Sequence, residues 1–233
     1  MNKKLKKRII TSIILIAIIL NCLFINNYSW LLLLFIVSFM CWFEFINLVK
    51  KIWKTKTIII LPIILSFLFL CLFIHAAYKF RIEEWVISIL FVLGICIFSD
   101  IGGYIVGKSI GGKKLTKISP KKTISGSIGS FLFSLFPLGV LMILGFEENL
   151  PGEAFLVCLL LSLACQLGDL IISYFKRLAR VKDTGKILPG HGGMLDRIDG
   201  IIFAIPSTLI LQLLPWKKKL QFLVPLVLLA DQP

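Results

Sequence analysis

The sequence predicts an all-α, polytopic integral membrane protein with about seven or eight transmembrane helices and cytoplasm-facing active-site loops. Of its 233 residues, 58% are hydrophobic, and the mean hydropathy is +0.96, well above the apolar content of soluble domains. Several apolar runs approach the roughly 20 residues that a helix needs to cross a bilayer. No run shows the alternation of apolar and polar residues that is typical of outer-membrane strands.

The apolar runs give the expected helices in order. They cover 9–25, 28–49, 57–77, 84–106, 128–146, 154–175 and 200–214, with a short apolar piece at 220–230. The N-terminus, MNKKLKKRIITSIILIAIIL, resembles a signal peptide but has no small-residue cleavage site after its apolar core. We therefore expect an uncleaved first helix whose basic end stays in the cytoplasm.

The charged residues between the runs set the orientation. Basic clusters lie at 3–8, 50–56, 107–127 and 176–199 and hold most of the 26 lysines and arginines. Two apolar runs separate each cluster from the next, so all four clusters fall on the same side of the membrane. The segment FEENLPGE, 146–153, is acidic and falls on the other side. This is the positive-inside pattern, with the basic clusters in the cytoplasm. Lys217, Lys218 and Lys219 are the exception, so either 200–230 forms a re-entrant hairpin or the count of spans is wrong by one.

The predicted organisation follows from this orientation. Residues 1–90 form N-terminal transmembrane helices, and residues 91–233 form a catalytic transmembrane region. The two polar loops of that region, 107–127 and 176–199, emerge on the same cytoplasmic face and can build one site. The formal net charge of +14 is explained by these loops, so no nucleic-acid partner is predicted.

Three acidic residues lie within or at the ends of apolar runs, where an ionisable side chain is costly and suggests function. For Glu44, in CWFEFINL, an interhelical hydrogen bond or an interfacial position is the favoured interpretation. Asp100 and Asp169 each lead toward a basic cytoplasmic loop, which favours a functional role for both.

Asp196 and Asp199 are three residues apart and share one face if a helix begins near residue 195. Asp169, in the preceding apolar run, could face them. Mg²⁺ prefers a few carboxylates together with water and substrate phosphate oxygens. Carboxylates beside basic, glycine-rich loops are the features of phosphoryl or nucleotidyl transfer.

Two local motifs need separate interpretation. The stretch GKSIGGKK lacks the Ser or Thr of a P-loop, because Lys114 stands there, and no buried strand precedes it. It is interpreted as phosphate binding within the site or as a basic anchor on anionic lipid. For His191, in PGHGG, a phosphate contact or a role in ordering the loop is favoured over metal ligation.

The segment SYFKRLARVKDTGKILPGHGGMLDRID, 173–199, resembles the signature of phosphatidate cytidylyltransferases (CDP-diacylglycerol synthases). It meets the fixed positions S-x-x-K-R, then K-D, then P-x-H-G-G-x-x-D-R-x-D; these are Ser173, Lys176, Arg177, Lys182, Asp183, Pro189, His191, Gly192, Gly193, Asp196, Arg197 and Asp199. Residues 99–130 resemble the second motif region of the family. Ile101 and Ser125 stand where members often carry Thr and Glu. The resemblance covers 95–215 well and 1–90 only in hydropathy.

The resemblance implies transfer of a cytidylyl group from CTP to phosphatidate, at the cytoplasmic face of a bacterial-type inner membrane. It implies Mg²⁺, with K⁺ beside it, held by Asp169 and Asp196. Asp199 helps the metal or orients Arg197, and Asp183 pairs with a cation or binds metal. The catalytic set is Asp169, Asp196, Asp199, Lys176, Arg177 and Arg197. The substrate-binding set is Asp100, Ser119, Lys121, Lys122, Lys182, Asp183, His191, Gly192 and Gly193. A homodimer is compatible with this expectation.

Two rival functions stay open. A transporter would also place acids in the membrane, although its polar residues would gather near the midplane. A CTP-dependent membrane lipid kinase would yield CDP and a phospholipid, where a synthase yields pyrophosphate. The phosphotransferases that consume CDP-diacylglycerol require A-R after D-G at a fixed spacing, and DRIDG is not followed by it.

Overall fold

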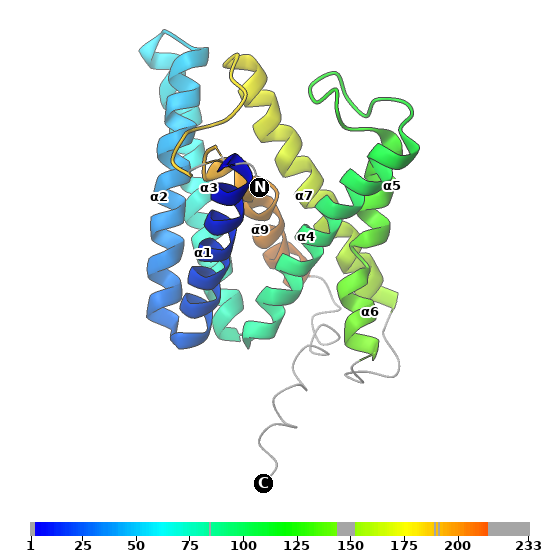
Figure 1. Cartoon of the computed structure of the whole chain (residues 1–233). Helices are drawn as coiled ribbons and strands as arrows, with labels where there is room; N and C mark the ends of the chain where they lie inside the picture. Colours follow the sequence, from blue (N-terminus) through cyan, green and yellow to red (C-terminus); the bar gives the residue numbers. More distant parts are fainter. Residues whose placement is uncertain (1–2, 84, 144–151, 189, 191, 214–233) are drawn as a thin grey trace. The chain divides into compact units, whose positions relative to one another are not determined.

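The computed structural model describes residues 3–83, 85–143, 152–188, 190 and 192–213. Within these residues the chain is almost entirely helical and contains no strand, only two isolated bridges (Figure 1). The elements are α1 (Lys3–Ile25), α2 (Asn27–Ile52), α3 (Lys56–Glu83), α4 (Trp85–Ile110), α5 (Ile124–Phe133), α6 (Phe136–Ile143), α7 (Gly152–Leu178), α8 (Leu195–Ile198) and α9 (Ile201–Leu213). The predicted all-α class is confirmed.

The helices have the length and composition of membrane spans. Five helical stretches qualify by length and hydropathy, namely Asn27–Ile52, Thr57–Ile82, Val86–Ile110, Ile124–Ile143 and Gly152–Leu178. Two shorter apolar helices, Ile9–Ile25 and Ile201–Leu211, complete the series among the described residues. Each of the seven long predicted runs therefore contains helix within its described residues, and the protein is an integral membrane protein. The apolar piece at 220–230 and Lys217–Lys219 lie outside the described residues.

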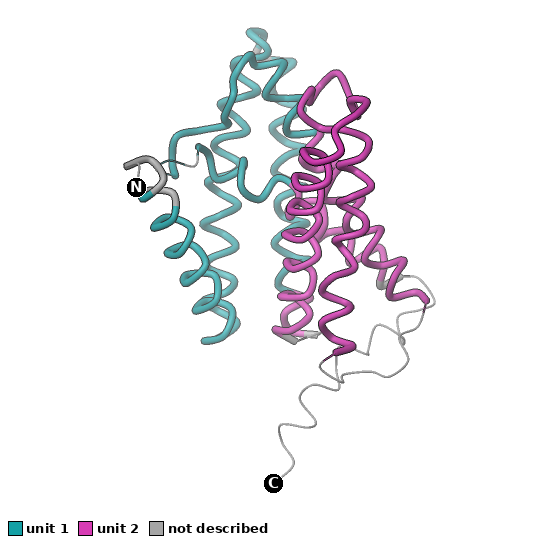
Figure 2. Tube along the Cα trace, turned by 45° about the vertical axis from the view of Figure 1, so that its right-hand side comes forward, with its two compact units in different colours: residues 1–78, 171–199 teal, residues 79–170, 200–233 magenta. Residues whose placement is uncertain are grey.

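The chain divides into two compact units (Figure 2). Unit 1 comprises 1–78 and 171–199, and unit 2 comprises 79–170 and 200–233. Each unit thus combines segments that are distant in sequence, and the boundary at 170 falls inside α7. This division differs from the predicted one at residue 90, which stays a prediction about functional regions.

In unit 1, α2 is defined at both ends by its own sequence. The Asn26 side chain accepts a hydrogen bond of 2.7 Å from the Ser29 N–H, which caps the first turn. The helix ends at Ile52, where Trp53 takes an extended conformation. Within the unit, the buried Trp30 indole donates to the Ala77 carbonyl oxygen of α3 at 3.3 Å.

In unit 2, α4 and α5 pack closely because glycines face each other. A Cβ atom on Gly126 would lie 2.8 Å from the Gly103 carbonyl oxygen and 3.3 Å from the Gly107 Cα. A Cβ atom on Gly129 would lie 2.7 Å from the Gly102 carbonyl oxygen. Small residues at this spacing let the backbones of membrane helices approach each other. The contact brings the N-terminus of α5, and the basic loop before it, against the end of α4.

Three boundaries differ from the sequence prediction. The described part of the run 128–146 is divided between two helices, α5 and α6, because Pro137 has no N–H to donate to the carbonyl oxygen of Phe133. The polar loop predicted at 107–127 is shorter, since α4 continues to Ile110 and α5 begins at Ile124. The loop predicted at 176–199 loses its ends in the same way to α7 and α8. A helix does begin at Leu195, but it is interrupted before α9.

Candidate active site

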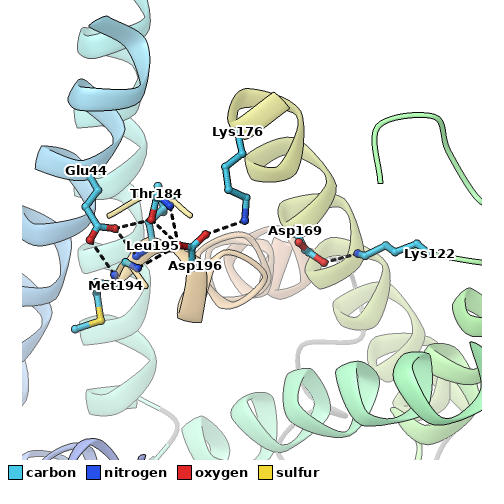
Figure 3. A network of polar contacts seen from close by, with 9 residues as sticks. Glu44, Lys122, Asp169, Lys176, Thr184, Met194, Leu195 and Asp196 are labelled. Carbon is cyan, nitrogen blue, oxygen red and sulfur yellow. Dashed lines mark hydrogen bonds and ion pairs between the residues drawn. The ribbon is translucent and has the colours of Figure 1, made fainter. Parts of the chain in front are cut away.

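The candidate site in unit 1 is built from the end of α7, the connection 179–194 and α8. The α7 helix carries Lys176 and Arg177 in its last turn. Its end is closed by the Val181 N–H, which donates to the Lys176 carbonyl oxygen at 3.0 Å. Lys176 Nζ lies 2.8 Å from Asp196 Oδ1 on α8, so the two ends of the connection are joined by an ion pair (Figure 3).

Asp196 is held through both of its carboxylate oxygens. While Oδ1 accepts from Lys176, Oδ2 accepts from the Thr184 N–H at 2.7 Å, the Thr184 hydroxyl at 3.0 Å and the Gly193 N–H at 3.1 Å. The side chain is only 6% exposed. Burial raises the pKa of Asp196, but the hydrogen bonds from Lys176, Thr184 and Gly193 and the Lys176 charge outweigh it and lower the pKa overall. The carboxylate is therefore an anion at neutral pH.

The paired glycines of the predicted signature have different structural roles. Gly192 has φ +91°, a left-handed conformation that favours glycine, and a Cβ atom there would lie 3.2 Å from Asp196 Oδ2. Its backbone N–H and carbonyl oxygen form a bridge with Leu188. A Cβ atom on Gly193 would overlap the side chains of Thr184 and Glu44. Glycine is therefore needed at both positions for the connection to pack against the carboxylates of Asp196 and Glu44.

In unit 2, the second candidate cluster pairs Asp169 with a lysine. Lys122 Nζ lies 2.5 Å from Asp169 Oδ2, and each side chain is 29% exposed (Figure 3). Asp169 comes from α7, and Lys122 comes from the loop 111–123 between α4 and α5. A partly exposed pair of this kind can exchange its ammonium partner for another cation, or its carboxylate partner for a phosphate.

The loop 111–123 has a defined backbone. Leu115 donates its N–H to the Lys122 carbonyl oxygen at 2.8 Å, and Ile124 donates to that of Lys113 at 3.0 Å. The Thr123 side chain then caps α5 by accepting from the Gly126 N–H at 3.0 Å. Ser125, where many members of the resembled family carry Glu, donates its hydroxyl hydrogen to the Gly111 carbonyl oxygen. The loop thus presents its lysines from a hydrogen-bonded framework.

The remaining predicted residues are placed as follows. Asp100 is exposed on α4, Ser119 and Lys121 lie in the loop 111–123, Arg177 is exposed on α7, Lys182 and Asp183 are exposed between α7 and α8, Arg197 is exposed on α8, and Asp199 follows α8. His191 lies outside the described residues. Among the described residues, no three His, Cys, Asp or Glu side chains are grouped so that they could hold a metal ion.

Two residues in the network of Asp196 were not predicted as site residues. Thr184 lies inside the quoted signature but at none of its fixed positions. Glu44 lies on α2 and accepts hydrogen bonds from Thr184 and Met194 in the connection and from Leu195 at the start of α8. Of the two alternatives favoured from the sequence, the interhelical hydrogen bond is therefore met by the Leu195 contact, while the other two partners lie outside helices. The signal of Glu44 in the sequence was a carboxylate within an apolar run.

Comparison with known proteins agrees with this picture. The family model described as "Cytidylyltransferase family" matches residues 59–214. A protein of Staphylococcus aureus (strain COL) named phosphatidate cytidylyltransferase is 49% identical over 123 residues, covering 51% of this chain and 46% of that protein. A protein of Staphylococcus haemolyticus (strain JCSC1435) with the same name is 46% identical over 120 residues, with the same coverage. The chain thus spans about half the length of the curated relatives it matches.

Proposed function

Because this chain belongs to the cytidylyltransferase family, we propose that it transfers the cytidylyl group of CTP to phosphatidate. The products are CDP-diacylglycerol and pyrophosphate. The observation that supports the proposal most directly is the Lys176–Asp196 pair, in which two positions of the predicted signature meet within one hydrogen-bonded network. The names of the Staphylococcus relatives point to the same reaction.

The proposed chemistry is a single in-line displacement. A phosphate oxygen of phosphatidate attacks the α-phosphorus of CTP, a new P–O bond forms, and the bond to the pyrophosphate oxygen breaks. A phosphomonoester is already ionised and nucleophilic at neutral pH, so the step needs no strong general base. It needs positive charge around the phosphates, because both substrates are polyanions.

The chain supplies that charge from two segments. Lys121 and Lys122 lie in the loop 111–123, and Lys176, Arg177, Lys182 and Arg197 lie in the signature. Lys122 and Lys176 are each paired with a carboxylate, and a phosphate can compete for either ammonium group. Asp100, Ser119, Asp183 and His191 are proposed substrate contacts from the sequence.

The acidic residues fit a magnesium ion in chemical type. Asp196 and Asp169 offer carboxylate oxygens, the hard donors that Mg²⁺ prefers, and each already attracts a cation, the ammonium group of Lys176 or Lys122. The family resemblance, and not a contact between the two residues, assigns the ion to Asp169 and Asp196, with Asp199 supporting it or orienting Arg197. Mg²⁺ would supply charge neutralisation at the phosphates. K⁺ is proposed beside it on the family resemblance alone.

The proposed location is the inner membrane of a bacterium, with the N-terminus and the site in the cytoplasm. A lipid substrate requires a site at the membrane, and a nucleotide substrate requires that it open to the cytoplasm. The basic segments 107–127 and 176–199 meet both requirements in the positive-inside orientation. All residues named in the proposal belong to one chain, so a homodimer is compatible with it but not required.

The test follows the phosphate label. The detergent-purified protein is incubated with dioleoyl phosphatidate, Mg²⁺ and CTP labelled at the α-phosphate. We expect label to enter the lipid phase, with pyrophosphate released in equal amount. Label that enters lipid only from γ-labelled CTP would replace the proposal with a lipid kinase. No transfer from either form would leave a transporter or an inactive relative as the better interpretation.

A further inference from the structure

The buried carboxylate of Glu44 is the feature of unit 1 that the proposed reaction does not use. Glu44 lies in the apolar helix α2 and is 2% exposed. It also lies outside residues 59–214, which the family model matches. A carboxylate buried in a membrane helix is costly unless it is hydrogen-bonded, so its partners indicate why it is there.

All of its hydrogen bonds that the structure shows come from the connection between α7 and α8 and the start of α8. Glu44 Oε1 accepts from the Met194 N–H at 3.0 Å, and Oε2 accepts from the Leu195 N–H at 2.9 Å and the Thr184 hydroxyl at 2.8 Å (Figure 3). The Leu195 N–H belongs to the residue just before Asp196. Glu44 therefore fixes the backbone that carries Asp196.

Two glycines make room for this carboxylate. A Cβ atom on Gly185 would lie 2.8 Å from Glu44 Cδ, and a Cβ atom on Gly193 would lie at the same distance from it. Gly193 also donates its N–H to Asp196. The backbone of the connection is thus shaped to fit Glu44 on one side and Asp196 on the other.

Thr184 connects the two acids directly. Its hydroxyl oxygen lies 2.8 Å from Glu44 Oε2 and 3.0 Å from Asp196 Oδ2, while its backbone N–H donates to Asp196 at 2.7 Å. A hydroxyl carries one hydrogen and can donate it to only one carboxylate at a time. A change at Glu44 therefore alters both the position and the hydrogen bonding of Thr184 against Asp196.

We propose that Glu44 is a positioning residue, which acts through Thr184 and the start of α8 to hold the Asp196 carboxylate in place for Mg²⁺. This rests on the proposed function, in which Asp196 is a metal ligand. In this role Glu44 acts through Thr184, Met194 and Leu195, which are its hydrogen-bond partners. Groups that orient a metal ligand typically change metal affinity or activity by about 10- to 100-fold when they are removed.

The experiment measures two quantities for each purified variant. One is kcat for cytidylyl transfer, and the other is the Mg²⁺ concentration that gives half of the Mg²⁺-induced thermal stabilisation. We expect Glu44→Gln to lower kcat and raise this Mg²⁺ midpoint, each by about 10-fold or more. The matched control is Ser38→Ala, because Ser38 is also buried on α2 and its hydroxyl has no hydrogen-bond partner within the described part of the chain. That variant should match the wild type.

A second pair of variants serves if Glu44→Gln does not fold. Thr184→Val removes the bridging hydroxyl at nearly constant volume and should raise the Mg²⁺ midpoint, whereas Thr184→Ser keeps the hydroxyl and should restore it. The double variant Glu44→Gln/Thr184→Val should be little worse than the more impaired single one, since both act on the same contact.

Wild-type Mg²⁺ midpoints in Glu44→Gln and Thr184→Val would overturn the positioning role, even if the proteins melt at lower temperature. A wild-type protein that Mg²⁺ does not stabilise would overturn it as well. Failure of the proposed function is distinguishable, because the protein would then bind Mg²⁺ with the expected variant effects but transfer no cytidylyl group.

Discussion

At the residue scale, both carboxylate oxygens of Asp196 accept hydrogen bonds. Replacing Asp196 by asparagine therefore tests whether the site needs two acceptor oxygens and a negative charge. In Asp196→Asn the amide nitrogen must face either Lys176 or the Thr184 and Gly193 N–H groups, so one donor is set against another. We expect turnover to fall by at least about 100-fold. Asp169→Asn should do the same. Turnover is measured with α-labelled CTP, and membrane insertion from the amount of protein in the membrane fraction.

The control is Asp231→Asn, the same chemical change at an acidic residue outside every predicted site. It should keep wild-type turnover. Near wild-type turnover in Asp196→Asn or Asp169→Asn, at equal membrane insertion, would contradict the assignment of that residue as a metal ligand.

The lowered pKa of Asp196 also predicts how stability depends on pH. A carboxyl whose folded pKa lies below its unfolded value, 3.8 here, stabilises the fold fully above that value. The stabilisation is lost as pH falls through the lower folded pKa. In metal-free detergent solution, the melting temperature of the wild type should therefore fall between about pH 5 and pH 3 by more than that of Asp196→Asn. Parallel curves for the two proteins would contradict this.

Much of this residue-scale chemistry was predictable, but not all of it. Lys176 and Asp196 were named from the signature, because charged residues at fixed spacing are visible in one dimension. The hydrogen-bond partners of Glu44 were not predictable, since the groups that donate to it are 140 to 151 residues away along the chain. Thr184 was missed because a lone threonine in a polar loop gives no chemical signal.

At the element scale, the contact between α4 and α5 predicts a sharp difference between two glycines. In Gly126→Ala the added methyl group would lie 2.8 Å from the Gly103 carbonyl oxygen, so the helices must separate. We expect a loss of about 1 to 3 kcal/mol in the free energy of unfolding. The loss is measured as a lower melting temperature in detergent, together with lower turnover, because α5 carries the loop with Lys122.

The matched control is Gly139→Ala in α6, where no described atom beyond the neighbouring residues and backbone of the same helix lies within 4 Å of the added methyl group. Alanine in a helix is favoured over glycine by about 0.5 to 1 kcal/mol, so this variant should be as stable as the wild type or slightly more stable. Equal effects of the two substitutions would argue against close packing of α4 on α5.

The elements themselves were predicted well where hydropathy defines them and less well at their ends. Apolar runs located the membrane helices, but α4 continues through the polar residues Lys108 and Ser109 because glycine-mediated packing stabilises its last turn. The break at Ser134–Leu135 was missed, since the run around it is uniformly apolar and only Pro137 marks it.

At the scale of the whole molecule, the distribution of positive charge predicts the orientation in the membrane. Lys117 and Lys186 are exposed residues of the two basic connections, and both should face the cytoplasm. We expect Lys117→Cys and Lys186→Cys to react with a membrane-impermeant maleimide in inverted vesicles and not in intact spheroplasts. The wild type sets the background, because four of its six cysteines are buried.

The opposite face provides the matched control. Glu148 belongs to the predicted external segment 146–153 and lies outside the described residues, and Glu148→Cys should react only in spheroplasts. Labelling of Lys117→Cys or Lys186→Cys from outside would contradict a cytoplasmic site for that loop, and with it the access of CTP.

The sequence by itself determined the helical membrane class and the family, and it predicted the charged residues of the candidate site. Hydropathy and motif spacing are local properties, so a linear chain displays them directly. Only the tertiary structure decided that α2 supplies Glu44 to the connection that carries Asp196, and that residues 171–199 belong to the same unit as residues 1–78. These contacts join residues that are more than a hundred positions apart in the chain. The pattern of apolar and charged residues does not predict them, because the same pattern is compatible with several ways of packing the helices.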